Sequence, residues 1–130
     1  MAHEFPVTVY YEDTDMAGIV YYANYLRYIE RARSEVVEEL GLDQRAMRED
    51  GIVFVVTRVE ADYISSARLG DRLTVVSENW AEGRLRWVFE QKVMHGERLI
   101  FKALVTAVCA NTDGKPVRLP AELRQQLAEK

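Results

Sequence analysis

Cysteine and long apolar runs are scarce in this 130-residue chain, and each scarcity excludes a class of structure. The single cysteine, Cys109, cannot form an intrachain disulfide. The longest apolar run, LIFKALVTAVCA, is interrupted by a lysine and is shorter than the roughly 20 apolar residues of a membrane-spanning helix. The opening sequence, MAHEFPVTVYYEDTD, lacks the basic and apolar segments of a secretory signal. We therefore expect a reduced, cytoplasmic protein without a membrane span.

Positive charge is not in excess either, which argues against a nucleic-acid partner. The net charge is −4 and the isoelectric point is near 5.3, whereas binding to a phosphate backbone requires a basic face. Repeats, low-complexity segments and linkers rich in proline, glycine or serine are missing as well. With 48% hydrophobic and 29% charged residues, the composition is typical of a globular chain, and we expect residues 1–130 to form a single domain.

Apolar periodicity predicts one strand, one long helix and then four strands. A β-branched and aromatic run at 7–12 predicts the first strand. Residues 23–40 carry an apolar stripe with helical spacing. Its members are Tyr25, Ile29, Ala32, Val36 and Leu40. Strand-like runs follow at 53–63, 72–80, 85–94 and 99–110, and a short terminal helix is expected at 120–129.

The short connections between the four later runs predict antiparallel neighbours. A sheet with one apolar face and a single long amphipathic helix can bury each other's apolar surfaces. We therefore expect an α+β fold in which a curved antiparallel sheet wraps around the long helix. The run at 99–110 is apolar on both faces, which favours a central strand. Exposed sheet edges favour edge-to-edge association of two copies.

The segment DTDMAG, which holds Asp13 and Asp15, is the candidate for chemistry. Its spacing imitates the start of a calcium-binding EF-hand loop. The fifth and twelfth loop positions are Ala17 and Asn24, however, so the loop lacks the oxygen ligands that calcium requires. The only two histidines are far apart in the sequence, which argues against a zinc site. We expect no bound metal.

Two interpretations of these aspartates stay open from the residues alone. Aspartates before a helix commonly form turns or caps, and Gly18 would then adopt a positive φ. Alternatively, a carboxylate that faces the N–H groups of a helix N-terminus suits acyl chemistry. The N–H groups would hold a carbonyl oxygen as it becomes an oxyanion, and the carboxylate would attack the carbonyl carbon or activate a water.

The sequence VYYEDTDMAGIVYYANYLRYIERARSE resembles the opening of the 4-hydroxybenzoyl-CoA thioesterase-like hotdog family, especially its Tol-Pal-associated acyl-CoA thioesterase branch. A second similar segment is DYISSARLGDRLTV, and the order of elements extends the resemblance over nearly the whole chain. The resemblance implies a single hotdog domain with five to six strands around the central helix. It also implies hydrolysis of an acyl-CoA substrate by a homodimer or homotetramer. Coenzyme A would enter only as part of the substrate, without a separate cofactor.

The resemblance also implies roles for individual residues. The catalytic carboxylate falls on Asp15, as nucleophile or general base, and the oxyanion donor falls on the backbone N–H of Tyr22. Asp13 keeps a structural role. Many members of the Tol-Pal branch have a histidine at the position of Tyr22, whereas aryl-CoA thioesterases can have a tyrosine there. We expect five residues to contact coenzyme A through their hydroxyl or guanidinium groups: Ser65, Ser66, Arg68, Arg84 and Arg86.

Two functions are alternatives to thioester hydrolysis. A hotdog hydratase or dehydratase would act on a β-hydroxyacyl chain, but this chemistry usually uses a histidine, and none lies near the DTDMAG segment. A non-catalytic acyl-thioester-binding protein, or a partner in a cell-envelope complex, would bind the ligand without turnover. Cys109 is expected to be a buried core thiol and His95 a turn residue.

Overall fold

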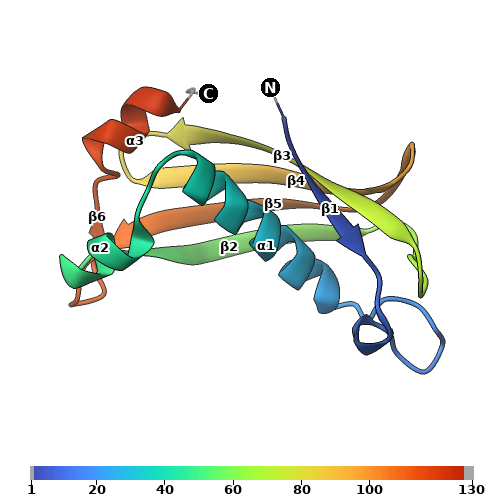
Figure 1. The fold of residues 1–130 in the computed structure, drawn as a ribbon. Coiled ribbons are helices and arrows are strands. Elements are labelled where there is room, and N and C mark those ends of the chain that lie inside the picture. The colour runs from blue at the N-terminus through green and yellow to red at the C-terminus, as the bar shows by residue number, and fades with distance from the viewer. Residues whose placement is uncertain (1, 128–130) are drawn as a thin grey trace.

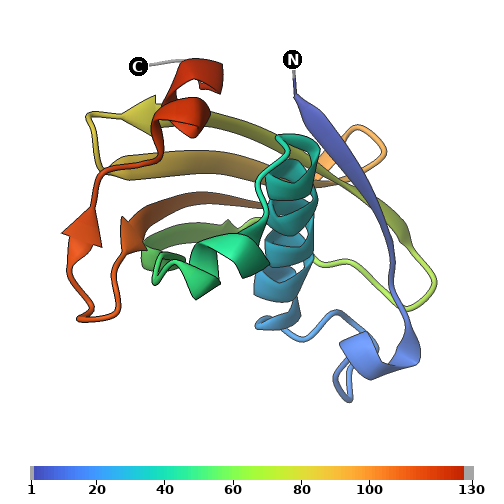
Figure 2. The same ribbon diagram turned by 60° about the vertical axis from the view of Figure 1, so that its left-hand side comes forward.

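The computed structural model describes residues 2–127, whose elements form one sheet with helices on one side and at one end. The elements in chain order are β1 (His3–Thr8), the 3-10 helix η1 (Tyr11–Asp13), α1 (Asn24–Glu39), α2 (Gln44–Glu49), β2 (Val53–Tyr63), β3 (Arg72–Glu82), β4 (Arg86–His95), β5 (Arg98–Ala110), β6 (Pro116–Val117) and α3 (Ala121–Gln126). Helix α1 lies across one face of the curved sheet (Figures 1 and 2). The expected α+β arrangement of helix and curved sheet is confirmed.

The sheet has six strands, all of whose pairings are antiparallel. The order is β1-β3-β4-β5-β2, and the two-residue strand β6 pairs with β5. β5 is therefore an inner strand, as its apolar faces predict. The loop between β1 and α1 lies at one end of the sheet, and α2 and β6 lie at the other end (Figures 1 and 2).

The prediction of a first strand at 7–12 is wrong. The strand is His3–Thr8, and the chain then turns into η1. The carboxylate of Asp13 accepts a hydrogen bond from the backbone N–H of Tyr10 at 2.8 Å. A local side-chain bond of this kind competes with the ladder of a strand and ends it early.

The other predicted elements lie close to their expected positions. Strand β2 coincides with the run at 53–63, and the bounds of β3, β4 and β5 differ from expectation by at most two residues. The long helix, expected at 23–40, is Asn24–Glu39. Gly18 adopts the expected positive φ of 78°. The terminal helix is Ala121–Gln126, and residues 128 and 129 of the expected 120–129 range lie outside the described residues.

The core lies between α1 and the facing side of the sheet. Four members of the helical stripe are buried, and Trp87, Phe89 and Val93 of β4 are buried as well. Burial raises the pKa of the Cys109 thiol to about 11, which agrees with the expected core role. Alternation along β4 also places Gln91 on this apolar face, where its side chain is fully buried.

Strand β2 forms an exposed edge of the sheet. Every β2 side chain except Phe54 is exposed in the single chain. Most of these exposed side chains are nevertheless apolar or aromatic. The large apolar side chains exposed on this edge are Val53, Val55, Val56, Val59 and Tyr63. Among residues 2–127, no helix has both the length and the apolar character needed to cross a membrane.

Candidate functional site

The loop that carries Asp15 is closed by backbone hydrogen bonds. The carbonyl oxygen of Asp13 accepts from the N–H of Tyr21 at 2.8 Å, and Thr14 pairs with Val20 in an antiparallel bridge. Inside these two pairings, the N–H of Asp15 donates to the carbonyl of Ile19 at 2.9 Å. The loop therefore holds Asp15 at a defined place in front of α1.

One oxygen of the Asp15 carboxylate is free to react. Oδ1 accepts a hydrogen bond from the N–H of Ala17 at 2.9 Å, which fixes the orientation of the group. Oδ2 has no hydrogen-bond partner among residues 2–127, and the side chain is exposed. Asp15 does not cap α1, because its only side-chain bond stays within its own loop.

The backbone at the start of α1 offers an unused donor. The N–H groups of Tyr22 and Ala23 make no hydrogen bond to any described residue, whereas the N–H of Tyr21 donates to Asp13 and the N–H of Asn24 donates to the carbonyl of Tyr21 at 2.8 Å. The first N–H groups of a helix have no intrahelical partner and carry its positive dipole end. Tyr22 can therefore donate to a ligand oxygen.

Asp15 and Tyr22 line the same open cleft, which has a volume of about 410 Å³. The other lining residues are Ile19, Val20, Tyr21, Tyr25, Tyr63, Ile64, Ser65 and Ser66. The structure thus brings four of the expected site residues together, namely Asp15, Tyr22 and the two serines. A largely apolar lining with a few polar groups is typical of a small-molecule site.

Tyrosines connect this cleft to the sheet. The hydroxyl of Tyr63, at the end of β2, donates to the carbonyl oxygen of Tyr22 at 3.1 Å. The hydroxyl of Tyr25 accepts from the N–H of Ala67 at 3.0 Å, and its ring stacks on Phe101. These contacts hold the start of α1 against the ends of β2 and β5.

Asp13 is buried beneath the loop. Its Oδ2 accepts from the N–H of Tyr10, and its Oδ1 accepts from the side-chain amide of Asn24 at 2.9 Å. Burial, together with the Asp13 carboxylate, raises the pKa of the Tyr28 hydroxyl. Asp13 therefore has the structural role expected for it, and it ties η1 to the first turn of α1.

The expected arginines do not all reach the cleft. Arg68 lies beside the loop, because it forms a backbone bridge with Ile19, and its side chain is exposed. Arg84 and Arg86 lie in the β3–β4 hairpin at the opposite end of the sheet, where Arg86 is level with Val108 of β5. β4 spans roughly 30 Å, so within one chain Arg84 and Arg86 lie far from the two serines, and their contact with coenzyme A stays a prediction.

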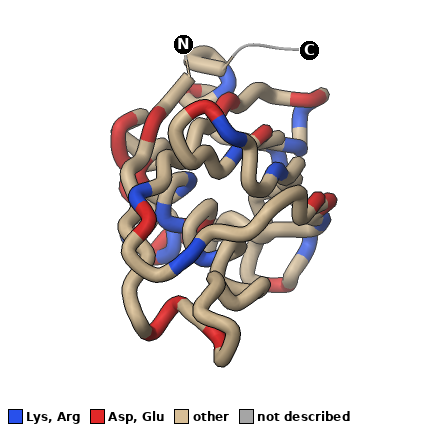
Figure 3. Tube along the Cα trace, turned by 90° about the vertical axis from the view of Figure 1, so that its right-hand side faces the viewer, with Lys and Arg blue, Asp and Glu red and all other residues tan. Residues whose placement is uncertain are grey.

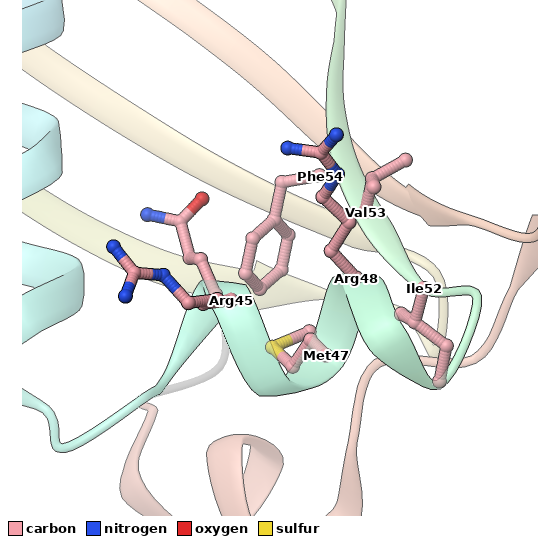
Figure 4. Close-up of a pocket in the computed structure, with 7 residues that line it drawn as sticks. Arg45, Met47, Arg48, Ile52, Val53 and Phe54 are labelled. Carbon is pink, nitrogen blue, oxygen red and sulfur yellow. The ribbon is translucent and has the colours of Figure 1, made fainter.

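Two arginines that the sequence analysis missed lie on α2. Arg45 and Arg48 border a pocket of about 380 Å³ between α2 and the start of β2 (Figure 4). Their spacing of three residues places them on neighbouring positions of one helical turn, which was the available signal. Along the Cα trace, basic and acidic residues are interspersed in the view of Figure 3.

The far end of α1 carries a group of ligand-type side chains. The Nε2 atom of His3 lies 2.8 Å from a carboxylate oxygen of Glu35 and 3.0 Å from one of Glu39. The sequence did not reveal this group, because the partners of His3 are two glutamates of α1 and not the second histidine. A hydrogen bond from Nε2 of His3 accounts for the closeness of the three side chains, so the group does not by itself indicate a metal.

Comparisons with known proteins extend over most of the chain. Residues 9–127 match the thioesterase-like superfamily. The chain is 39% identical over 122 residues to the acyl-CoA thioesterase YbgC of Haemophilus influenzae, covering 92% of this chain and 90% of that protein. It is 37% identical over 120 residues to the acyl-CoA thioester hydrolase YbgC of Escherichia coli O6:H1, covering 91% and 90%. A crystal structure of a probable thioesterase from Bartonella henselae superposes with a TM-score of 0.85 at 34% identity, covering 92% and 100%.

Proposed function

Because this chain belongs to the thioesterase-like superfamily and is an acyl-CoA thioesterase, we propose that Asp15 and the backbone N–H of Tyr22 carry out the hydrolysis. The fold is the hotdog fold of that family, as the resemblance implies. The observation that carries the assignment of the site is that a carboxylate with a free oxygen and an unpaired backbone donor just before α1 line the same cleft. An association with the Tol-Pal system stays a prediction.

In the proposed reaction, the thioester carbonyl oxygen accepts a hydrogen bond from the N–H of Tyr22. That bond strengthens as the oxygen gains negative charge in the tetrahedral intermediate. The free oxygen of Asp15 either attacks the carbonyl carbon or removes a proton from a water that attacks it. The carbon–sulfur bond then breaks, the thiolate takes up a proton, and coenzyme A leaves. If water attacked, this step releases the carboxylic acid directly. If Asp15 attacked, it leaves a mixed anhydride on Asp15, and a water then hydrolyses this anhydride to the acid and the free Asp15 carboxylate.

The substrate brings its own coenzyme A, and the proposed chemistry uses no metal and no prosthetic group. Ser65 and Ser66 line the cleft and Arg68 borders its loop, so we assign contacts with coenzyme A to these three residues. Arg84 and Arg86 stay predictions as contacts made from another copy of the chain. We place the reaction in the cytoplasm.

Release of free thiol from a panel of acyl-CoAs tests this function against its two rivals. We expect stoichiometric release of coenzyme A and acid from at least one thioester. A hydratase would interconvert β-hydroxyacyl and enoyl thioesters without releasing thiol. A non-catalytic binding protein would bind acyl-CoA tightly and leave the thioester intact. Either of these two results would contradict the proposal.

We further propose that two copies pair through β2. The apolar edge of β2 has unpaired backbone groups, and such edges associate readily. The cleft ends on Tyr63 and Ile64, at one end of the same strand, so a second copy on this edge would supply a wall that one chain leaves open. The supporting observation is the exposure of every β2 side chain except Phe54.

The variant Val59→Asp should separate the two copies. Burying a carboxylate in an apolar interface without a partner is costly, so we expect the mass in sedimentation equilibrium to fall to that of one chain. Turnover should fall about tenfold or more, on the scale of lost substrate positioning. Leu85→Asp is the matched control, because Leu85 is 41% exposed against 43% for Val59 but lies in the β3–β4 turn. A wild-type monomer with full activity would contradict this proposal.

A further inference from the structure

A second pocket lies under the middle of α1, away from Asp15, and contains a half-buried arginine. The pocket has a volume of about 180 Å³. Its apolar wall consists of Val37, Phe54, Val56, Trp87, Phe89 and Ala107. Arg33 and Glu30 contribute its charged groups. The reaction proposed above uses none of these side chains.

The guanidinium of Arg33 is held in place but is largely unpaired. Its only hydrogen bond to a described residue joins Nη1 to Oε1 of Gln91 at 2.9 Å. The amide of Gln91 is itself fixed, because its Nε2 donates to the carbonyl of Ile29 at 2.8 Å and to Oγ of Ser77 at 3.0 Å. The remaining N–H groups of Arg33 have no acceptor among residues 2–127.

The nearby carboxylate does not neutralise this cation by contact. Glu30 accepts from the hydroxyl of Ser34 at 2.8 Å and forms no ion pair with Arg33 among the described residues. Burial lowers the pKa of Arg33, and Glu30 partly opposes this effect. A half-buried guanidinium in an apolar pocket is stabilised most by an anion that it can hold through two parallel hydrogen bonds, and a carboxylate has that geometry.

We propose that this pocket binds a small organic carboxylate, with the carboxylate on Arg33 and the apolar part between Trp87, Phe89 and Val56. The volume suits a single six-membered ring, because an apolar protein cavity of about 150 Å³ accommodates benzene. The aromatic walls offer edge and face contacts to such a ring. Benzoate is therefore a suitable probe.

Titration of benzoate and of neutral benzamide into the wild-type protein tests the proposal directly. The two probes have the same shape, and only benzoate carries a charge. In nuclear magnetic resonance spectra, benzoate should shift the Arg33 Nε–H and Ala107 amide signals saturably, with an affinity at least tenfold higher than that of benzamide. Equal affinities, or the lack of a saturable shift, would overturn the proposal without the use of any variant.

Variants then assign the binding to the guanidinium. Arg33→Met should abolish the preference for benzoate over benzamide. Arg33→Lys should retain part of it, because an ammonium keeps the charge but loses the two-pronged geometry. Arg31→Met is the matched control and should bind benzoate like the wild type, since Arg31 lies exposed on the same helix. Unchanged benzoate binding in a folded Arg33→Met protein would overturn the proposal.

The source of such a carboxylate rests on the proposed function: a free acid, such as the product of hydrolysis, would bind Arg33 and inhibit turnover, and Arg33→Met would remove that inhibition. Benzoate binding is also measured on Asp15→Asn, so failure of the hydrolytic function and failure of the pocket give different results.

Discussion

Asp15→Asn should lower acyl-CoA turnover by about 100-fold or more while the fold stays intact. The substitution keeps the size and shape of the side chain but removes its charge and its basicity. Losses on this scale are typical of a missing general base or nucleophile. Stability should change little, because the side chain is exposed and its one hydrogen bond, accepted from Ala17, can be accepted by the amide oxygen of asparagine.

Thiol release measures the turnover of this variant, and circular dichroism measures its thermal unfolding. Acyl-CoA binding should persist in Asp15→Asn, since the N–H of Tyr22 is unaffected. Asp113→Asn is a suitable control, because it makes the same chemical change in an exposed turn far from the cleft. Turnover at the wild-type rate in Asp15→Asn would show that the catalytic assignment is wrong, even within the correct family.

Asp13→Asn should instead lower the free energy of unfolding by about 1–3 kcal/mol, the usual cost of a buried polar group that loses its partner. The two carboxylate oxygens of Asp13 accept from two different donors, the N–H of Tyr10 and the side-chain amide of Asn24. Asparagine has one oxygen, so its own N–H₂ group would face a donor. Chemical denaturation measures the change in the free energy of unfolding.

Asp43→Asn provides the matched control for this effect. Asp43 also accepts two backbone N–H groups, from Arg45 and Ala46, but both bond to the same oxygen, Oδ1. An asparagine can supply that oxygen, and the two residues are about equally good at a helix N-cap. We expect Asp13→Asn to be clearly less stable than Asp43→Asn. Equal stability of the two variants would contradict the buried role of Asp13.

The Asp13→Asn and Asp15→Asn variants should differ in turnover as well. Asp13→Asn should retain more activity than Asp15→Asn, because Asp13 acts on the cleft only through the position of the loop and the first turn of α1. The sequence alone assigns Asp13 a structural role. Its burial and its two separate donors raise the expected loss of stability in Asp13→Asn.

The sequence by itself determined the order of the predicted elements and the long helix. These features depend on local patterns: a helical stripe, strand alternation, and a glycine that permits a tight loop before a helix. The assignment of catalysis to Asp15 and Tyr22 rests instead on the resemblance to the hotdog family and stays a prediction. The first strand is the exception, because the side chain of Asp13 accepts a hydrogen bond from the backbone N–H of Tyr10 and ends β1 early. Such competition is also local, but it cannot be seen from β-propensity.

The tertiary structure alone decided which residues meet across the sheet. Periodicity shows that one side of a strand faces the core, but it does not show that Gln91 on that side meets Arg33 from the helix. Nor does it show that Arg86 lies a full strand length from the Asp15 cleft. The exposed edge of β2 likewise follows from strand order, which is set by packing between segments distant in sequence rather than by the segment itself.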